Sequence, residues 1–426
     1  MTAAAGAGPD PFSRLCERPM PCFARQPILD ERGRVFGYEL FYGPQALDCE
    51  EAGDGTLASA RILTEAVSAL GLEALTGSRP VFVKFSRDLL LRGCGTLLPP
   101  SAMVIELDRD MPIDANVLET CRRLSDSGYA IGLDSAVVGD SPTASVMPYA
   151  KFVRVNVAQT TAASRRALVT QLRFRGVRLI AEMVETQEIA AEVRSDGYRL
   201  LQGRYYCMPK PFDSARIAGN NAAYLQLLGG LNRSDLSVDE VEDLIKHDAS
   251  LCYRVLRSIN SPIYGLRREI SSIRQAIVLL GQDQIRKWAS VWVLSGLNIN
   301  GIDETLSVAL VRARACELLG RELADADDRS GCFLLGLCSV LDVLIGQPMV
   351  QILSELPLSG AIKDALLGKR SRLRPILDAV VAYERGAWDE AALAVTQARV
   401  AAAPLPNVYA SALAWVPALR AAVEGP

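Results

Sequence analysis

The stretch MVIELD at residues 103–108 is followed by a helical pattern over 115–127 and then by AIGLDSA at 130–136, which makes one βα unit of a repeating series. Five further β-rich runs occur in the first half of the chain: VFGYELF (35–41), VFVKFS (81–86), FVRVNV (152–157), RLIAEMV (178–184) and LLQG (200–203). Strands that alternate with helices in this way form parallel sheets. A series of about seven units favours a closed parallel barrel of the TIM type. An open doubly wound sheet is the alternative.

The segments between these strands are long enough for crossover helices, which we predict at residues 56–70, 115–127, 162–175 and 187–195. No G-x-G-x-x-G or G-x-x-x-x-G-K-[ST] motif follows any of the strands. The glycine-rich phosphate loops that would favour an open sheet are therefore missing.

The second half of the chain is predicted to be all-α. After Met208-Pro209-Lys210-Pro211 the strand signals stop, and the pattern stays helical to about Arg420. We expect a flexible N-terminus at 1–20, a barrel at 21–214 and a helical domain at 215–426. Ser272 and Gly281 have the right types and spacing to begin and end one helix, and Asp248 and Asp283 are predicted N-caps of two others.

The composition excludes several classes of protein. The 426 residues are 50% hydrophobic and 22% charged with a net charge of -3, so the chain should fold and offers no attractive field for nucleic acid. We interpret its one local basic cluster, residues 369–374, as a solvated loop. The single histidine, His247, nearly rules out multi-histidine metal sites and histidine-based hydrolases.

The cysteines and the apolar runs indicate where the protein works. Ten cysteines include no C-x-x-C pair, which fits a reducing cytosol. The first residues have no signal-peptide pattern, and the longest apolar stretch, 332–345, is too short for a bilayer and contains Asp342. We expect a cytoplasmic protein without a membrane span.

Polar residues recur near the carboxyl ends of the predicted strands: Glu39, Lys84, Glu106, Asp134, Asn156, Glu182 and Gln202. A barrel builds its active site at this end, and although each residue alone is well explained as a solvated loop residue, the whole set in register is not. Converging carboxylates repel each other and raise their pKa values unless a divalent cation or a fixed side-chain cation neutralises them. Lys84 and Arg154 are placed to do so.

Four motifs in this half are FARQPILDERGRVFGYELFYG (23–43), GLDS (132–135), LIAEMVET (179–186) and LQGRYYCMPKP (201–211). Together they resemble the EAL domains, barrel phosphodiesterases that linearise cyclic di-GMP with bound divalent cations. The resemblance covers about residues 23–212. It places the acidic positions of the family on Glu39, Glu106, Asp134 and Glu182, with Glu185 and Gln202 also kept.

The resemblance also implies that several functional positions have changed together. Lys84 stands where the family has a metal-binding Asn, Ser135 stands at the second Asp of an aspartate pair, and Arg154 replaces the Lys that positions or activates water. The other changes are Asn156 for an Asp, Gly43 for a phosphate-contacting Arg and Arg109 for an acid. An ammonium group supplies no Lewis acid, and a guanidinium with its very high pKa cannot act as a base.

We therefore predict a vestigial, non-catalytic EAL pocket without metal or cofactor, formed by Glu39, Lys84, Glu106, Asp134, Ser135, Arg154, Glu182 and Gln202. The acids of this pocket need compensation that no metal supplies. Lys84 is accordingly expected to form a buried or half-buried ion pair with Glu39, Glu106 or Asp134.

The second half resembles the HDOD domain, a helical relative of HD phosphohydrolases that has lost their metal ligands. The segments 245–288 and 333–359 carry this resemblance, which covers about residues 215–390. In GLCSVLD (336–342) the resemblance places Ser339 and Val340 at the former ligand positions. The dipeptide His247-Asp248 lacks the further ligands of an HD site, so we interpret Asp248 as a helix N-cap.

The order of the two halves resembles that of bacterial EAL–HDOD signal-transduction proteins. We expect a non-catalytic signalling or scaffold protein that acts through protein contacts, with the barrel as a sensor and the helical domain as output. A cyclic di-GMP receptor without turnover and an active phosphodiesterase are the alternatives. The sequence names no protein partner, leaves a homo-oligomer open, and favours neither nucleic acid nor membrane as a partner.

Overall fold

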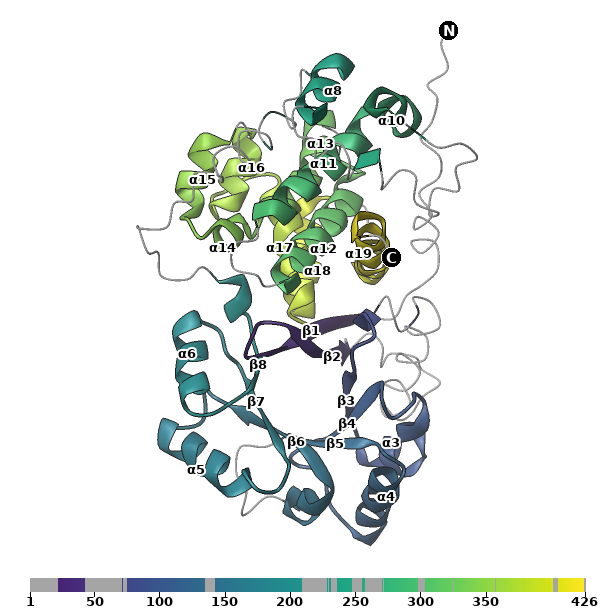
Figure 1. The fold of residues 1–426 in the computed structure, drawn as a ribbon, viewed down its shortest axis with the longest axis vertical. Helices are drawn as coiled ribbons and strands as arrows, with labels where there is room; N and C mark the ends of the chain where they lie inside the picture. The colour runs from purple at the N-terminus through teal and green to yellow at the C-terminus, as the bar shows by residue number, and fades with distance from the viewer. Residues whose placement is uncertain are drawn as a thin grey trace. The chain divides into compact units, whose positions relative to one another are not determined.

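The computed structural model has a closed barrel in the first half of the chain and helices in the second (Figure 1). One compact unit contains Met20–Met208, and the other contains Pro209–Tyr383 and Ala387–Pro426. The structure describes residues 22–42, 71, 75–134, 142–208, 228, 230, 236–246, 255–256, 270, 272–297, 303–323, 325–356, 358–400 and 405–424. The predicted flexible segment 1–20 and the boundary near residue 215 lie outside these residues.

Eight strands close the barrel in chain order. They are β1 (Phe23–Asp30), β2 (Val35–Tyr42), β3 (Val81–Phe85), β4 (Met103–Leu107), β5 (Ala130–Asp134), β6 (Ala150–Asn156), β7 (Arg178–Glu182) and β8 (Leu200–Gln202). Strands β2 to β8 pair in parallel, whereas β1 is antiparallel to both β2 and β8. The closed barrel is confirmed, the open sheet is excluded, and the seven predicted strands run parallel, whereas β1 is an additional antiparallel strand that was not predicted.

The direction of β1 follows from its short connection to β2. Parallel neighbours need a crossover of a dozen or more residues, whereas a tight turn joins antiparallel neighbours only. In this turn Asp30 Oδ1 accepts hydrogen bonds from the backbone N–H groups of Arg32 and Arg34, both at 2.9 Å. Gly33 has φ +76°, a conformation that glycine adopts without strain. The chain therefore reverses within residues 31–34.

Four described α-helices lie outside the ring of strands: α3 (Arg87–Leu91), α4 (Ala115–Asp126), α5 (Ala162–Leu172) and α6 (Gln187–Ser195) (Figure 1). Each begins at an N-cap side chain, Ser86, Asp114, Thr161 or Thr186, that accepts a hydrogen bond from a backbone N–H of the first turn. The helices predicted at 115–127, 162–175 and 187–195 are confirmed. The one predicted at 56–70 lies outside the described residues.

Near the amino ends of the parallel strands, the interior of the barrel is filled by an apolar layer. It consists of Ile28, Phe82, Val104, Phe152, Ile180 and Leu200, with Phe36 and Ala130 packed against them. The rings of Phe36, Phe82 and Phe152 lie with centroids 5.2 to 6.2 Å apart. Side chains alternate along a strand, so the residues two positions further along each parallel strand also point into the barrel. The apolar layer is therefore the floor on which the polar side chains stand.

A β-bulge places Phe36 in this floor. Ile28 pairs with Gly37 and Leu29 pairs with Val35, so Phe36 is the extra residue of β2. A Cβ atom on Gly37 would lie 2.8 Å from Cε2 of Phe82. The absence of a side chain at Gly37 thus gives Phe82 its room.

The second unit is helical throughout its described residues. Its helices are α8 (Val238–Lys246), α10 (Ile273–Leu280), α11 (Gln282–Leu297), α12 (Asp303–Gly320), α13 (Ala326–Cys338), α14 (Leu341–Ile345), α15 (Met349–Glu355), α16 (Gly360–Leu366), α17 (Arg374–Glu384), α18 (Trp388–Ala398) and α19 (Leu405–Glu424). Ser272 and Gly281 bound α10 as predicted. Asp283 lies inside the first turn of α11 and is not its N-cap, because the helix resumes directly after Gly281. Asp248 lies outside the described residues.

Helices α12 and α13 pack at backbone distance. A Cβ atom on Gly336 would lie 2.3 Å from the carbonyl oxygen of Arg312, and one on Gly320 would lie 2.3 Å from Sγ of Cys332. Only glycine fits such an approach.

Among the residues that the structure describes, no helix is long and apolar enough to cross a membrane.

Candidate functional site

The candidate site is the polar layer, the inward-facing side chains directly above the apolar layer: Gln26, Glu39, Lys84, Glu106, Arg154, Glu182 and Gln202. The register of the strands brings them together. Lys84 of β3 stands beside Glu106 of β4, and Gln26 of β1 stands beside Glu39 of β2. Residues far apart in the sequence thus meet at the end of the barrel where the sequence places the site.

Arg154 of β6 is the centre of this layer. Its side chain is 1% exposed, with Nε 2.5 Å from Glu106 Oε1, and Nη1 3.1 Å from Glu39 Oε2 and 3.6 Å from Glu182 Oε2. The side chains of Glu106 and Glu39 are buried as well, whereas that of Glu182 is 22% exposed. One guanidinium therefore contacts three of the acids that the sequence places at the barrel mouth.

Gln202 of β8 completes the hydrogen bonding around Arg154. Its Oε1 accepts from Arg154 Nη1, and its Nε2 donates to Glu39 Oε2 at 2.6 Å and to Gln26 Oε1 at 2.9 Å. The amide fixes the positions of the guanidinium and of one carboxylate together. Gln26 is absent from the predicted site because its strand is not among the predicted strands.

The space for Glu106 comes from Gly132 of β5. These two residues are register neighbours, and a Cβ atom on Gly132 would lie 3.0 Å from Glu106 Cγ. Because no side chain fills the β5 side, the Glu106 carboxylate lies toward β6 and meets Arg154. The glycine of the GLDS motif thus has a role of its own, which is to leave space for the side chain of Glu106.

Burial sets the electrostatics of the layer. Burial raises the pKa of Glu106 to about 7; Arg154 opposes the rise, and the charge of Glu39 adds to it. Burial alone would lower the pKa of Arg154, but the charges of Glu106 and Glu39 outweigh it and raise that pKa above its ordinary value. Glu106 Oε2 and Arg154 Nη2 are buried without a hydrogen-bond partner in the described part of the chain. Arg154 therefore compensates part of the negative charge of the layer, and the layer is not fully hydrogen-bonded.

The expected position of Lys84 is wrong. The structure leaves its side chain exposed, so Lys84 is not the buried or half-buried cation of the site. Arg154 takes that place, because Glu106 lies toward β6 and because a delocalised guanidinium loses less hydration than an ammonium when it is buried.

The remaining predicted residues do not join the buried ion pairs around Arg154. Asn156 ends β6, where its side chain accepts a hydrogen bond from the N–H of Ala158 at 3.0 Å and so shapes the following loop. Arg109 is exposed after β4, and Glu185 forms an ion pair with Arg204 at 2.6 Å. Asp134 ends β5 with a side chain outside the described set. Ser135 and Gly43 lie outside the described residues.

The residue that follows Glu182 in the chain, Met183, has a strained backbone conformation. Met183 has φ +61° and its side chain is 50% exposed, an uncommon conformation for a residue with a side chain. Gly203, just after β8, has φ +148°, and a Cβ atom there would lie 2.0 Å from the carbonyl oxygen of Val184. The segment after β7 is therefore pressed against the end of β8, next to the polar layer.

The donor set of the polar layer does not fit a divalent cation. The carboxylates that would ligate a metal are engaged by the guanidinium of Arg154, and an ion between them would have to displace it. No group of three or more His, Cys, Asp or Glu side chains within the described ranges is arranged to hold a metal ion.

Ser339 and Val340, which the resemblance to HDOD domains places at the former ligand positions, lie between α13 and α14. Ser339 Oγ donates to the carbonyl oxygen of Gly336 at 2.7 Å and accepts from Arg312 Nη1 at 3.3 Å, and Val340 is buried. The hydroxyl therefore has a structural role at the end of α13, and Val340 has an apolar one. His247 and Asp248 are outside the described residues.

Comparison with known proteins supports both halves. The HDOD domain family matches residues 220–353. The uncharacterized protein YuxH of Bacillus subtilis is 30% identical over 373 residues, which are 86% of this chain and 91% of that relative. The cyclic di-GMP phosphodiesterase CdgJ of Vibrio cholerae is 29% identical over 370 residues, which are 86% of this chain and 85% of that relative.

Among solved structures, the EAL-domain protein YkuI of Bacillus subtilis, in complex with substrate c-di-GMP and calcium, has 18% identity and a TM-score of 0.37. The match covers 64% of this chain and 75% of that one. The match to YuxH extends over most of both chains and takes in the barrel as well as the HDOD region. The chain thus belongs to the family of proteins that join an EAL-type barrel to an HDOD domain.

Proposed function

We propose that this chain is a non-catalytic signal-transduction or scaffold protein of cyclic di-GMP signalling that acts through protein contacts. The name of its relative CdgJ, a cyclic di-GMP phosphodiesterase, supports the signalling context. The polar layer supports the absence of turnover.

The observation that carries this proposal is the guanidinium of Arg154 between Glu39, Glu106 and Glu182. Breaking a buried ion pair by removing one partner costs about 3–5 kcal/mol, so a metal that displaced Arg154 would have to compensate a loss of that size. The guanidinium stabilises the acids and at the same time occupies their ligand oxygens.

The two most buried charged residues of the polar layer, Arg154 and Glu106, are not suited to activate water. Arg154 stays protonated, because the neighbouring carboxylates raise its pKa. Glu106 is fully buried with one oxygen engaged by Arg154, so it has no route to a solvent molecule. Phosphodiester hydrolysis requires an activated nucleophile, and neither Arg154 nor Glu106 supports one.

The direct test is a turnover assay on the purified full chain with cyclic di-GMP and either Mg²⁺ or Mn²⁺. We expect no linear dinucleotide by chromatography. An active EAL enzyme assayed beside it serves as the positive control for substrate and metal. Metal-dependent appearance of the linear product, lost on Glu39→Ala, would refute the proposal.

A receptor that binds cyclic di-GMP without turnover is the second candidate, and the exposed cations at the mouth favour it. Lys84 is exposed in β3, and Arg109 is exposed just after β4 with no ion pair within the described ranges. Equilibrium titration of the full chain with cyclic di-GMP tests this. Saturable binding that weakens in Lys84→Gln with no linear product would assign the receptor role, whereas absence of binding leaves the scaffold role.

We further propose a cytoplasmic location and a protein partner. None of the seven cysteines that the structure describes is part of a disulfide, which fits a reducing compartment. On α10 the side chains of Val278 and Leu279 are exposed, which suits a protein contact better than isolation in water. Val278→Asp should leave the melting temperature unchanged and weaken capture of a partner, while capture unaffected by Val278→Asp would exclude this helix face.

A further inference from the structure

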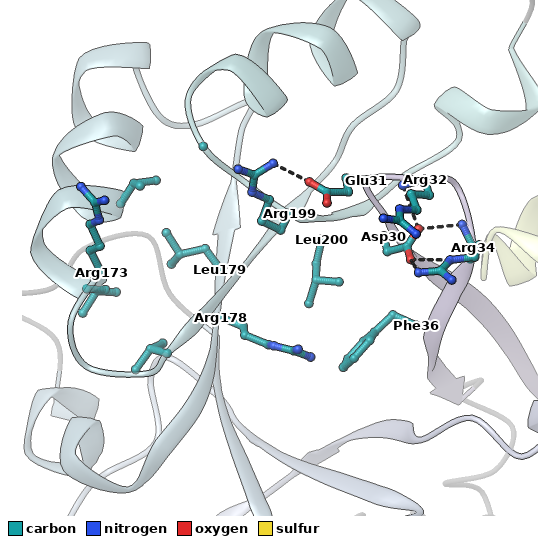
Figure 2. A pocket seen from close by; sticks show the side chains of 14 residues that line it. Asp30, Glu31, Arg32, Arg34, Phe36, Arg173, Arg178, Leu179, Arg199 and Leu200 are labelled. Atoms are coloured by element: carbon teal, nitrogen blue, oxygen red, sulfur yellow. Dashed lines mark hydrogen bonds and ion pairs between the residues drawn. The ribbon is translucent and has the colours of Figure 1, made fainter.

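A cavity of about 610 Å³ lies at the opposite end of the barrel from the polar layer. We call it the basal pocket. Its walls are the turn between β1 and β2, the end of α5, and the beginnings of β7 and β8. Figure 2 shows these elements around it. The apolar layer, which includes Phe36 and Leu200, separates the basal pocket from the candidate site.

The basal pocket is strongly cationic. Five guanidinium groups and two carboxylates line it, which leaves a net charge of +3; they are Arg32, Arg34, Arg173, Arg178, Arg199, Asp30 and Glu31. The chain as a whole has a net charge of -3, so this concentration of arginine is a local feature. Like charges gathered in a hollow repel each other unless an anion joins them.

The two carboxylates are already engaged at the rim. Asp30 Oδ2 lies 2.9 Å from Arg34 Nη2, and Glu31 pairs with Arg199 (Figure 2). Arg173 and Arg178 have no carboxylate partner within the described part of the chain. These two guanidinium groups, one from α5's C-terminal end and one from the first position of β7, are free to bind an anion.

An aromatic and apolar surface lies beside these charges. The Cζ atom of Arg178 lies 5.1 Å from the ring centroid of Phe36, and Figure 2 shows its side chain extending toward that ring. Leu172, Leu179 and Leu200 add apolar walls. A guanidinium over an aromatic ring forms a flat surface on which a planar group can stack while the N–H groups at its edge remain available.

We propose that the basal pocket binds a nucleoside phosphate of mononucleotide size. Arginine side chains bind phosphate through paired N–H groups, and the Phe36–Arg178 surface accepts the base. A cavity of this volume falls in the range of about 300–1,000 Å³ typical of small-molecule sites, and it is far larger than a free phosphate needs. The limited volume and the apolar walls favour a small molecule over an acidic peptide.

Calorimetric titration of the purified full chain with GMP and with AMP tests the proposal. Ribose 5-phosphate, guanosine and inorganic phosphate serve as probes that lack the base, the phosphate or both the base and the sugar. We expect saturable binding of at least one nucleotide, with each partial probe binding about tenfold or more weakly. Arg178→Gln should weaken nucleotide binding about tenfold or more, and Arg173→Gln should weaken it in the same direction.

Arg123→Gln is the matched control, because Arg123 is an exposed arginine on α4 outside the basal pocket. It should leave the affinity unchanged, and unaltered melting temperatures in all three variants show that folding is intact. No saturable binding of GMP or AMP up to about 1 mM would overturn the proposal, and so would equal affinity in Arg178→Gln. Phosphate binding as tight as nucleotide binding, or binding of a hexaglutamate peptide without nucleotide binding, would also overturn it.

Discussion

The polar layer and the basal pocket lie at opposite ends of one barrel, and both are built around arginine. In the polar layer Arg154 is buried among carboxylates, and its charge is used inside the protein. In the basal pocket Arg173 and Arg178 are exposed beside carboxylates that other arginines already neutralise. An arginine thus indicates a structural cation or a ligand site according to its partners and its burial, and the residue type alone does not decide.

The largest expected effect is the loss of the buried cation. Arg154→Met leaves Glu39 and Glu106 buried without compensation, so the free energy of unfolding should fall by about 3–5 kcal/mol. Arg178→Gln at the other end should change it by no more than about 0.5 kcal/mol. Urea unfolding of the two variants measures both. Equal effects would remove the distinction between the two regions.

A methyl group at Gly132 tests why Glu106 turns toward Arg154. In Gly132→Ala the added Cβ would lie 3.0 Å from Glu106 Cγ, and we expect a loss of about 1–3 kcal/mol from overpacking. Gly360→Ala is the control, since a Cβ atom there meets no atom within 4 Å. A neutral Gly132→Ala would show that Glu106 does not depend on this space.

The raised pKa of Glu106 predicts a pH dependence of stability. Burial raises its pKa from 4.5 to about 7, so between these values the folded state binds a proton that the unfolded state releases. The contribution of Glu106 to stability should therefore decrease as the pH rises from about 4.5 to about 7, by about 2–3 kcal/mol. The difference in unfolding free energy between the wild type and Glu106→Gln, measured at pH 5, 6 and 7, isolates it. If the wild type became more stable relative to Glu106→Gln as the pH rises, the sign would be opposite to the prediction.

The smallest expected effect concerns the strained residue beside the polar layer. Met183 has φ +61°, where glycine is less strained, although glycine costs more backbone entropy on folding. Met183→Gly should therefore stabilise the protein by about 0.5 kcal/mol, as measured by thermal unfolding. A clear loss of stability would indicate that the exposed methionine makes a contact that outweighs the strain.

Much of the barrel is predictable from the sequence because most of its strands are short β-rich runs between helical segments. Strand β1 is the exception. Its sequence FARQPILD contains Pro27 and mixes polar and apolar residues, and it pairs antiparallel through a tight turn, so it is not part of a βα unit. The helix at Ile273–Leu280 is predictable because both of its ends have capping residues.

The site is predictable only in part. Strand-end positions identify Glu39, Glu106 and Arg154, but they do not reveal which cation is buried, because Lys84 also stands on the inward side. The space beside Gly132 decides it, and that space exists only in the folded barrel. The basal pocket is invisible to sequence reading because its arginines are scattered from residue 32 to residue 199.

By contrast, two arginines of the one local basic cluster, residues 369–374, are paired with carboxylates. Arg372 pairs with Asp328 and Arg374 pairs with Asp378, each at 2.7 Å. The interpretation of this cluster as a solvated loop agrees with the exposed residues 369, 370 and 372, although Arg374 already begins α17.

We propose that the buried guanidinium of Arg154 takes the place of metal chemistry in the barrel. The most direct measurement is the metal-dependent conversion of cyclic di-GMP by the purified full chain, with Glu39→Ala as the comparison. We expect no linear dinucleotide from either protein with Mg²⁺ or Mn²⁺. Linear product from the wild type that requires the metal and disappears in Glu39→Ala would contradict the proposal.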